Sequence, residues 1–195
     1  MKICYPLNLP FHVSQKWDEG KTYYTTIGLK GHNGWDFSCP EGTKVYATHD
    51  GVIQFAGVDS TMSLTVGIDS TDDRFRTLYC HLSELKVKYG QNVKRGDLIA
   101  LSGNTGRFTT GPHLHFGLRP LPAQMDNGYN GATNPVNYFD GTYPNTVSGK
   151  DPQHFIDFQK ALEQFQIAEG LDPYPLVGPN TRKKLNKYLK TKYVI

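Results

Sequence analysis

The sequence has few cysteines, no long apolar run and almost no surplus of either charge. Three cysteines, Cys4, Cys39 and Cys80, are too few for a disulfide framework, and their spacing is not the CxxC of a metal site. No apolar stretch approaches the ~20 residues of a membrane span. Residues 1–6 lack the apolar core of a signal peptide. We therefore expect no disulfide-stapled fold and no membrane insertion, while the redox compartment stays open.

Charge is nearly balanced overall but unevenly distributed. The net charge of +3 comes from 21 basic and 18 acidic residues, and residues 150–195 hold eight of the basic and five of the acidic ones. Subtraction leaves thirteen of each before residue 150, so the whole surplus lies towards the C-terminus. A basic surplus suits contact with an anionic polymer, although a solvated face has the same composition. We expect no nucleic-acid partner.

At 195 residues the chain can form one larger domain, or one domain of roughly 150 residues with a small appendage. Short segments rich in β-branched and aromatic residues, bounded by Gly, Asp, Asn or Ser, are typical of strands. They are residues 44–47, 52–56, 63–68, 76–81 and 97–101. Asp50-Gly51 predicts a tight hairpin turn between two of them. With no long helical period in between, the pattern predicts a mainly β fold with an antiparallel sheet.

The pattern changes near residue 150. Apolar residues recur every three or four positions, which is typical of an amphipathic helix; they are Phe155, Phe158, Leu162 and Phe165. A second helix is predicted from Gly178-Pro179 onwards. We therefore predict a β domain over residues 1–140, a linker over 141–150 and a small α-helical module over 151–195.

Five histidine and aspartate positions stand out by their spacing. His32 precedes Asp36 by four residues, and His113 precedes His115 by two, so the latter pair share one face of an extended strand. His81 ends a separate strand-like segment. One aspartate and two histidines form a zinc set that leaves one coordination position open, and the remaining histidines can move protons. Spacing alone does not say which of His113 and His115 binds the metal.

The order of motifs around these residues resembles the lysostaphin-type zinc metallopeptidases. The matching segments are Gly31-His32 through Asp36-Phe37, Tyr79-Cys80-His81-Leu82-Ser83, Ser102-Gly103-Asn104-Thr105-Gly106, Pro112-His113-Leu114-His115-Phe116 and Asn134-Pro135-Val136-Asn137-Tyr138-Phe139. The resemblance covers roughly residues 28–140 without a break. It implies a groove-bearing antiparallel sheet and an endopeptidase that cuts peptide bonds in bacterial peptidoglycan, in the stem peptide or the cross-bridge.

The resemblance also assigns roles to individual residues. It implies that His32, Asp36 and His115 bind one Zn²⁺ per chain and that His81 and His113 are the catalytic histidines. Such enzymes often carry a tyrosine shortly before the first histidine, placed to hydrogen-bond the substrate. Here threonines occupy much of that stretch, and Tyr24 is the candidate substitute. We expect a monomer whose choice of bond depends on groove loops, notably Pro120 to Gly131.

The C-terminal segment resembles the small helical peptidoglycan-binding module. Phe158-Gln159-Lys160-Ala161-Leu162 and Val177-Gly178-Pro179-Asn180-Thr181 carry this likeness, although the usual Asp-Gly before the second helix is missing. The segment is either a reduced wall-binding module or a helical cap on the β domain. A wall enzyme without a signal peptide is typical of a phage lysin, released at lysis or carried in the virion. A secreted bacterial enzyme lacking its signal would have the same sequence.

Two other functions fit parts of the sequence. A non-catalytic wall-binding protein, or an activator of other wall hydrolases, would need a defective metal site, and none is visible. The pattern in residues 90–100 also occurs in lipoyl and biotinyl carrier domains, but no lysine stands in a suitable turn. Of the other residues, Cys80 and Trp35 are predicted to pack in the core, with Cys80 facing away from His81. The unassigned His12, His49 and His154 are predicted to be ordinary surface or helix residues.

Overall fold

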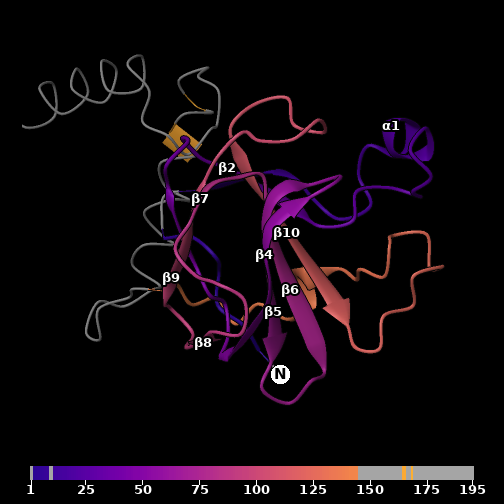
Figure 1. Cartoon of the computed structure of the whole chain (residues 1–195). Coiled ribbons are helices and arrows are strands. Elements are labelled where there is room, and N and C mark those ends of the chain that lie inside the picture. Colours follow the sequence, from indigo (N-terminus) through magenta and orange to yellow (C-terminus); the bar gives the residue numbers. More distant parts are fainter. Residues whose placement is uncertain (1, 9–10, 145–163, 166–167, 169–195) are drawn as a thin grey trace, which may run out of the picture. The chain divides into compact units, whose positions relative to one another are not determined.

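The computed structural model describes residues 2–8, 11–144, 164–165 and 168 (Figure 1). Residues 2–8 and 13–144 belong to one compact unit. The predicted helical module, residues 151–195, lies almost entirely outside the described residues, so its prediction stays untested. Within the described part of the chain, no helix is long and apolar enough to cross a membrane.

Two β-sheets make up the folded unit. A seven-stranded sheet has the order β1-β2-β10-β6-β5-β4-β8, and a three-stranded sheet has the order β3-β9-β7. The elements are β1 His12–Gln15, α1 Lys21–Thr25, β2 Trp35–Ser38, β3 Lys44–Tyr46, β4 Gly51–Asp59, β5 Ser63–Ser70, β6 Phe75–Cys80, β7 Leu82–Leu85, β8 Asn92–Val93, β9 Leu98–Ser102, β10 His113–Pro120 and a 3₁₀ helix Pro135–Asn137. The pairings described from β2 to β10 are antiparallel. The mainly β, antiparallel prediction is therefore confirmed, and the five predicted strands correspond to β3, β4, β5, β6 and β9.

The predicted hairpin at Asp50-Gly51 is wrong. β3 pairs with β9, whereas β4 pairs with β5 and β8, so the strands on either side of this dipeptide lie in different sheets. Gly51 serves close packing instead, because a Cβ atom there would lie 2.1 Å from the carbonyl oxygen of Asp69 on β5. A glycine in a strand can mark such a close approach of two backbones as well as a turn.

Strand alternation divides the central strands into a core face and an opposite face. On β10, Leu114, Phe116 and Leu118 are fully buried in the core. The intervening residues, beginning with His113 and His115, point to the other face. β6 alternates in the same way and lies directly beside β10 in the sheet (Figure 1). The polar residues of two neighbouring strands therefore share one surface.

The fully buried Tyr79 on β6 anchors a small polar network in the core. Its hydroxyl oxygen accepts a hydrogen bond from the backbone N–H of Thr48 at 2.9 Å and lies 3.2 Å from the hydroxyl oxygen of Thr77. Removing this oxygen would leave a buried backbone donor without a partner. Such a loss costs more than the net value of the hydrogen bond itself.

We therefore expect Tyr79→Phe to lower the free energy of unfolding by about 1–3 kcal/mol. Urea unfolding, with the midpoint compared at constant slope, measures this change. Tyr89→Phe removes the same atom from a side chain that is 71% exposed, and it should change stability by less than about 0.5 kcal/mol. Equal midpoints for the two variants would contradict the assigned role of the hydroxyl.

The prediction that His49 is an ordinary surface or helix residue is wrong. The residue is 1% exposed, and its Nδ1 donates to the carbonyl oxygen of Asp50 at 2.9 Å. Its Nε2 lies 2.9 Å from the hydroxyl oxygen of Thr77. Burial lowers the pKa of His49, so the imidazole is a neutral hydrogen-bonding group of the core. His12 lies in β1, partly exposed, and His154 lies outside the described residues.

Candidate active site

The sheet register brings the predicted zinc ligands together. His32 lies in the loop before β2, Asp36 lies on β2, and His115 lies on β10 directly opposite Asp36 in the ladder. All three side chains are buried. The contact between Asp36 and His115, which are 79 positions apart in sequence, therefore follows from the pairing of β2 with β10.

The three donor atoms form a nearly equilateral triangle. His32 Nε2 lies 3.0 Å from His115 Nδ1 and 3.1 Å from Asp36 Oδ1, and the distance from His115 Nδ1 to Asp36 Oδ1 is 2.9 Å. In a tetrahedral zinc site with bonds near 2.0–2.1 Å, neighbouring donors are roughly 3.3 Å apart. Two imidazole nitrogens and one carboxylate oxygen are also donors that zinc prefers. The residues present therefore fit zinc, with small outward movements, and leave its fourth position free for water or substrate.

Surrounding backbone groups orient the two histidines of this cluster. His32 Nδ1 lies 3.1 Å from the carbonyl oxygen of Lys16, which can only accept, so Nδ1 carries the proton and the lone pair of Nε2 points into the cluster. A Cβ atom at position 34 would lie 2.7 Å from Cε1 and 2.8 Å from Nε2 of His115. Gly34 thus allows the loop between the first two ligands to pack directly on the ring of the third.

The protonation states of the cluster suit metal binding. Burial favours the neutral form of Asp36, but the neighbouring His115 and His32 outweigh it and hold the pKa of this carboxyl below its ordinary value. Burial lowers the pKa of His115, which keeps the imidazole neutral. At neutral pH the cluster therefore offers an ionised carboxylate and unprotonated nitrogen, the forms in which these side chains bind zinc.

The two predicted catalytic histidines lie beside the cluster. The rings of His81 and His113 have centroids 4.8 Å apart, and His113 Nε2 lies 3.8 Å from Asp36 Oδ2. Each Nδ1 donates to a backbone carbonyl at 2.8 Å, that of Thr105 for His81 and that of Gly111 for His113. In both rings Nε2 is consequently the nitrogen left for substrate. Burial and the neighbouring His115 and His113 lower the pKa of His81 to about 4, so its Nε2 is an unprotonated acceptor at neutral pH.

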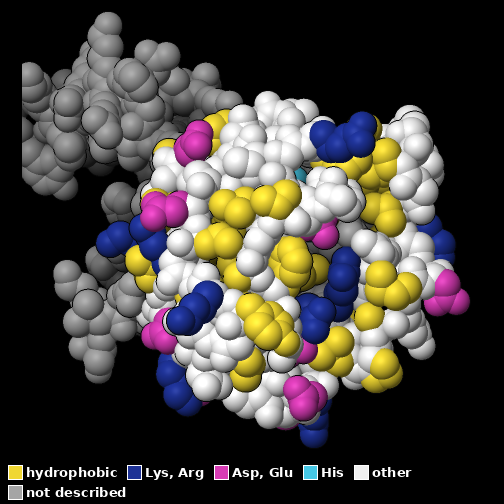
Figure 2. All heavy atoms as spheres, viewed as in Figure 1, with side chains coloured by type: hydrophobic (Ala, Val, Ile, Leu, Met, Phe, Trp, Pro, Cys, Tyr) yellow, Lys and Arg dark blue, Asp and Glu magenta, His cyan; other side chains and the backbone are white. Residues whose placement is uncertain are grey.

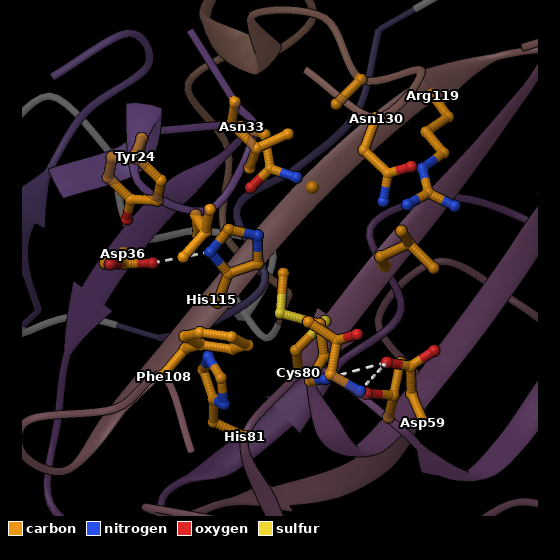
Figure 3. A pocket seen from close by; sticks show the side chains of 18 of the residues that line it. Tyr24, Asn33, Asp36, Asp59, Cys80, His81, Phe108, His115, Arg119 and Asn130 are labelled. Carbon is orange, nitrogen blue, oxygen red and sulfur yellow. Dashed lines mark hydrogen bonds and ion pairs between the residues drawn. The ribbon is translucent and has the colours of Figure 1, made fainter. Parts of the chain in front are cut away.

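A groove with a cavity volume of about 320 Å³ runs past these residues. Tyr24 and Phe108 line the part nearest the cluster (Figure 3), while Leu78 and Gly117 line a further stretch. Figure 2 shows a hollow on this face of the molecule with hydrophobic and cationic side chains around it. The groove that the resemblance implied is therefore present.

Cys80 is buried, as predicted, but it does not face away from His81, because both residues line the groove. His81 has a φ of 61°, in the left-handed region, and this turn of the backbone breaks the alternation of the strand. Burial raises the pKa of the Cys80 thiol to about 12, so it is not a nucleophile at neutral pH. Trp35 packs against Phe139 with ring centroids 5.6 Å apart, in agreement with a packing role.

Several groove residues were missed by the sequence analysis. Phe108 stands in a loop with no periodic pattern, so nothing in the sequence marks it. Arg119 and Asn130 lie side by side in the groove (Figure 3). Arg119 could have been found, because the alternation that pairs His113 with His115 continues through residue 119 to the same face.

Residues 121–131 form an irregular segment, as predicted for this loop, whereas Pro120 still belongs to β10; the segment is fixed to the chain before β2. The hydroxyl of Tyr129 donates to Asp18 Oδ1 at 2.6 Å, and its ring packs on Trp17 with centroids 4.4 Å apart. Lys30 Nζ donates to the carbonyl oxygen of Asn127 at 3.2 Å. These contacts hold Asn130 at the groove.

Comparison with known families gives the same assignment as the geometry. Residues 30–135, which include every residue of the cluster and both adjacent histidines, match Peptidase family M23. The chain belongs to peptidase family M23. The resemblance to lysostaphin-type metallopeptidases is thereby confirmed, and the carrier-domain interpretation of residues 90–100 is superseded.

Individual M23 proteins resemble the chain in sequence and in fold. Peptidoglycan DD-endopeptidase ShyA of Vibrio cholerae is 36% identical over 162 residues, which are 82% of this chain and 35% of ShyA. A zinc-containing peptidase from Vibrio cholerae superposes with a TM-score of 0.55 at 35% identity, covering 62% of this chain and 39% of that one. The catalytic domain of the antimicrobial peptidase lysostaphin from Staphylococcus simulans gives a TM-score of 0.51 at 29% identity, covering 61% of this chain and 96% of that one. The chain thus spans about a third of the length of ShyA.

Proposed function

We propose that this chain is a zinc-dependent endopeptidase that hydrolyses peptide bonds in bacterial peptidoglycan, in the stem peptide or the cross-bridge. The observation that carries the proposal is the convergence of His32, Asp36 and His115 beside two further histidines at a groove. Membership of family M23 and the likeness to a peptidoglycan DD-endopeptidase support the substrate class. A non-catalytic activator would not need this complete set.

Bound zinc would supply a Lewis acid that polarises a carbonyl oxygen and acidifies a water molecule. The remaining chemistry belongs to the chain. His81 and His113 each have one ring nitrogen fixed on a backbone carbonyl and Nε2 left for substrate. A neutral Nε2 can take the proton of the attacking water, and the resulting N–H can stabilise the oxyanion or protonate the leaving amine. The buried, ionised Asp36 would hold the metal together with His32 and His115.

Tyr24 is proposed to hydrogen-bond the substrate at this site. It lines the groove, and its ring lies 5.4 Å from that of His32. Its hydroxyl donates to Gln15 Oε1 at 3.1 Å, and burial raises its pKa, so it stays a protonated donor at neutral pH. A neutral donor this close to the cluster can turn to a developing oxyanion.

We expect Tyr24→Phe to lower kcat by about 10-fold to 1,000-fold, the range for removing one oxyanion donor, with zinc content unchanged. Tyr89→Phe is the control, because it removes the same atom from a side chain that is 71% exposed and does not line the groove. Steady-state cleavage of a defined wall fragment measures both variants. Equal rates for Tyr24→Phe and the wild type would remove this residue from the mechanism.

The test of the proposed function is digestion of purified peptidoglycan by the zinc-loaded protein, before and after complete chelation. New amine termini should appear only with metal and should return when zinc is restored. Mass spectrometry of the fragments identifies the bond. Undiminished digestion by the zinc-free protein, or none by the loaded protein on walls of several compositions, would overturn the proposal.

We further propose that the protein acts at the bacterial cell wall, as a phage lysin or a secreted enzyme, and that residues 151–195 form a wall-binding module. The module is supported by the sequence likeness alone. Its test is sedimentation of the full chain and of a chain ending at residue 145 with intact walls. Equal retention of the two would leave residues 151–195 without a wall-binding role.

A further inference from the structure

Strand β10 continues the groove beyond the metal cluster. His113, His115, Gly117 and Arg119 alternate along one face of this strand, and all four line the groove. At about 3.3 Å per residue, Arg119 stands about 13 Å along the strand from His115. An extended peptide lying in the groove would cover that distance with about four residues.

The floor of the groove between His115 and Arg119 has no protruding side chain from β10. Gly117 is the residue between them on this face, and a Cβ atom there would meet Leu78 Cβ only at 3.6 Å and His115 Nε2 at 3.8 Å. Leu78, the neighbour of Gly117 on β6, adds an apolar surface. No side chain of β10 therefore separates a substrate at the metal from the guanidinium of Arg119.

Arg119 has no anionic partner within the part of the chain that the structure describes. Its Nε is buried and has no hydrogen-bond partner, and no ion pair involves its guanidinium among the described residues. A buried donor without a partner is costly, and a buried charge without one is costlier. Burial lowers the pKa of Arg119; the charge of Arg76 adds to this, whereas Cys80 and Asp59 oppose it, and a guanidinium stays protonated at neutral pH.

Nearby groups that could neutralise Arg119 are already engaged. Arg76, opposite it on β6, has its own carboxylate, since Nε and Nη2 donate to the two oxygens of Asp69 at 2.5 and 2.9 Å. Asp59 accepts hydrogen bonds at 2.8 Å from the backbone N–H groups of Thr61 and Met62. Asp69 thus forms its ion pair with Arg76, and Asp59, which also lines the groove, makes no ion pair with Arg119 among the described residues.

Asn130 completes the surroundings of this charge. Figure 3 shows its side-chain amide beside the guanidinium, at the opposite side of the view from Tyr24 and Phe108. An arginine fork with an amide beside it matches a carboxylate, which accepts two parallel N–H bonds from the fork. A neutral peptide carbonyl could not balance the charge.

We propose that Arg119 is a specificity-determining residue that binds a free carboxylate of the substrate peptide, within about four residues of the scissile bond. The inference rests on the proposed endopeptidase function and adds the substrate class, a peptide with an acidic group beside the bond that is cut. Peptides whose corresponding carboxyl is amidated are then poor substrates.

The test uses two cross-linked stem-peptide dimers joined by a D-alanyl–meso-diaminopimelate bond, one with free diaminopimelate carboxyls and one with these carboxyls amidated. The wild-type protein should cut the free acid with a kcat/KM about 10-fold to 100-fold higher, the range for a hydrogen bond to a charged group. Arg119→Gln should abolish this preference through KM, and Arg119→Lys should keep part of it.

Arg74→Gln is the control for net charge, because that arginine lies in the turn before β6 with its side chain 77% exposed, and it should leave the preference intact. Binding of the same two dimers to the zinc-loaded His113→Ala chain, with and without Arg119→Gln, tests the subsite separately from cleavage. If the wild type cuts neither dimer, the proposed function fails on this bond, and tighter binding of the free acid that depends on Arg119 still supports the subsite. Two results would overturn the proposed role of Arg119. One is equal binding of both dimers, and the other is an Arg119→Gln variant in which the cleavage of both dimers falls by the same factor.

Discussion

His115→Ala is expected to remove zinc from the protein and to lower peptidoglycan cleavage on the order of 1,000-fold or more, because the activated water is lost with the metal. His115 Nδ1 lies within 3.0 Å of both other donors, and the ring is buried between β2 and the loop that contains Gly34. Alanine leaves two donors, which is one fewer than a catalytic zinc site uses. Metal analysis after dialysis, together with fragment release from walls, measures both effects.

A buried imidazole also fills space, so the loss must be separated from unfolding. Asp36→Asn provides this separation, since it keeps the shape of the side chain and removes the charge that balances the metal. It should lose zinc and activity while the metal-free protein still unfolds in one cooperative transition, at a lower midpoint because the ionised Asp36 stabilises the fold. Wild-type activity in a variant that holds no zinc would contradict the assignment of the site.

His113→Ala is expected to keep about one zinc per chain and still lose about 100-fold to 10,000-fold in kcat, the range for general acid–base catalysis. The residue touches the cluster only at 3.8 Å, from Nε2 to the second oxygen of Asp36. Its other nitrogen is held by the carbonyl of Gly111 at 2.8 Å, so the ring is positioned for proton transfer. We expect His81→Ala to behave in the same way.

The two histidine variants test each other. Zinc retained by His113→Ala and lost by His115→Ala supports the assignment of one residue to catalysis and the other to the metal. The reverse result would exchange their roles. If both variants lost zinc, His113 would be needed for metal binding. The loss of kcat in His113→Ala could then not be attributed to acid–base catalysis.

Local patterns predicted much of this site and left one choice open. Strand alternation predicted that His113 and His115 share a face, and they do. It could not say which one meets Asp36, because that depends on the register between β2 and β10, strands separated by more than seventy residues. Register is set by long-range pairing and burial, which no short sequence pattern contains. The family resemblance supplied the choice of His115.

Other features escaped the sequence because they depend on backbone conformation or on distant partners. The wrong orientation of Cys80 came from assuming extended backbone through His81, where φ is 61°. His49 was mistaken for an ordinary residue because its partner, Thr77, lies on another strand. The carbonyl of Lys16, which fixes the tautomer of His32, belongs to the backbone and has no signature in the side-chain sequence.

The left-handed backbone of His81 has a consequence for how this protein can change over generations. A residue other than glycine in a sparsely populated conformation costs of order 1–3 kcal/mol, and glycine or asparagine adopts the left-handed region more readily. Position 81 therefore carries a side chain that the proposed catalytic role requires and that folding disfavours. If the proposed function holds, we expect a lineage that loses hydrolysis to gain stability by replacing this histidine. In M23 proteins, glycine or asparagine at this position would then indicate that catalytic activity has been lost while the metal-binding residues are still present.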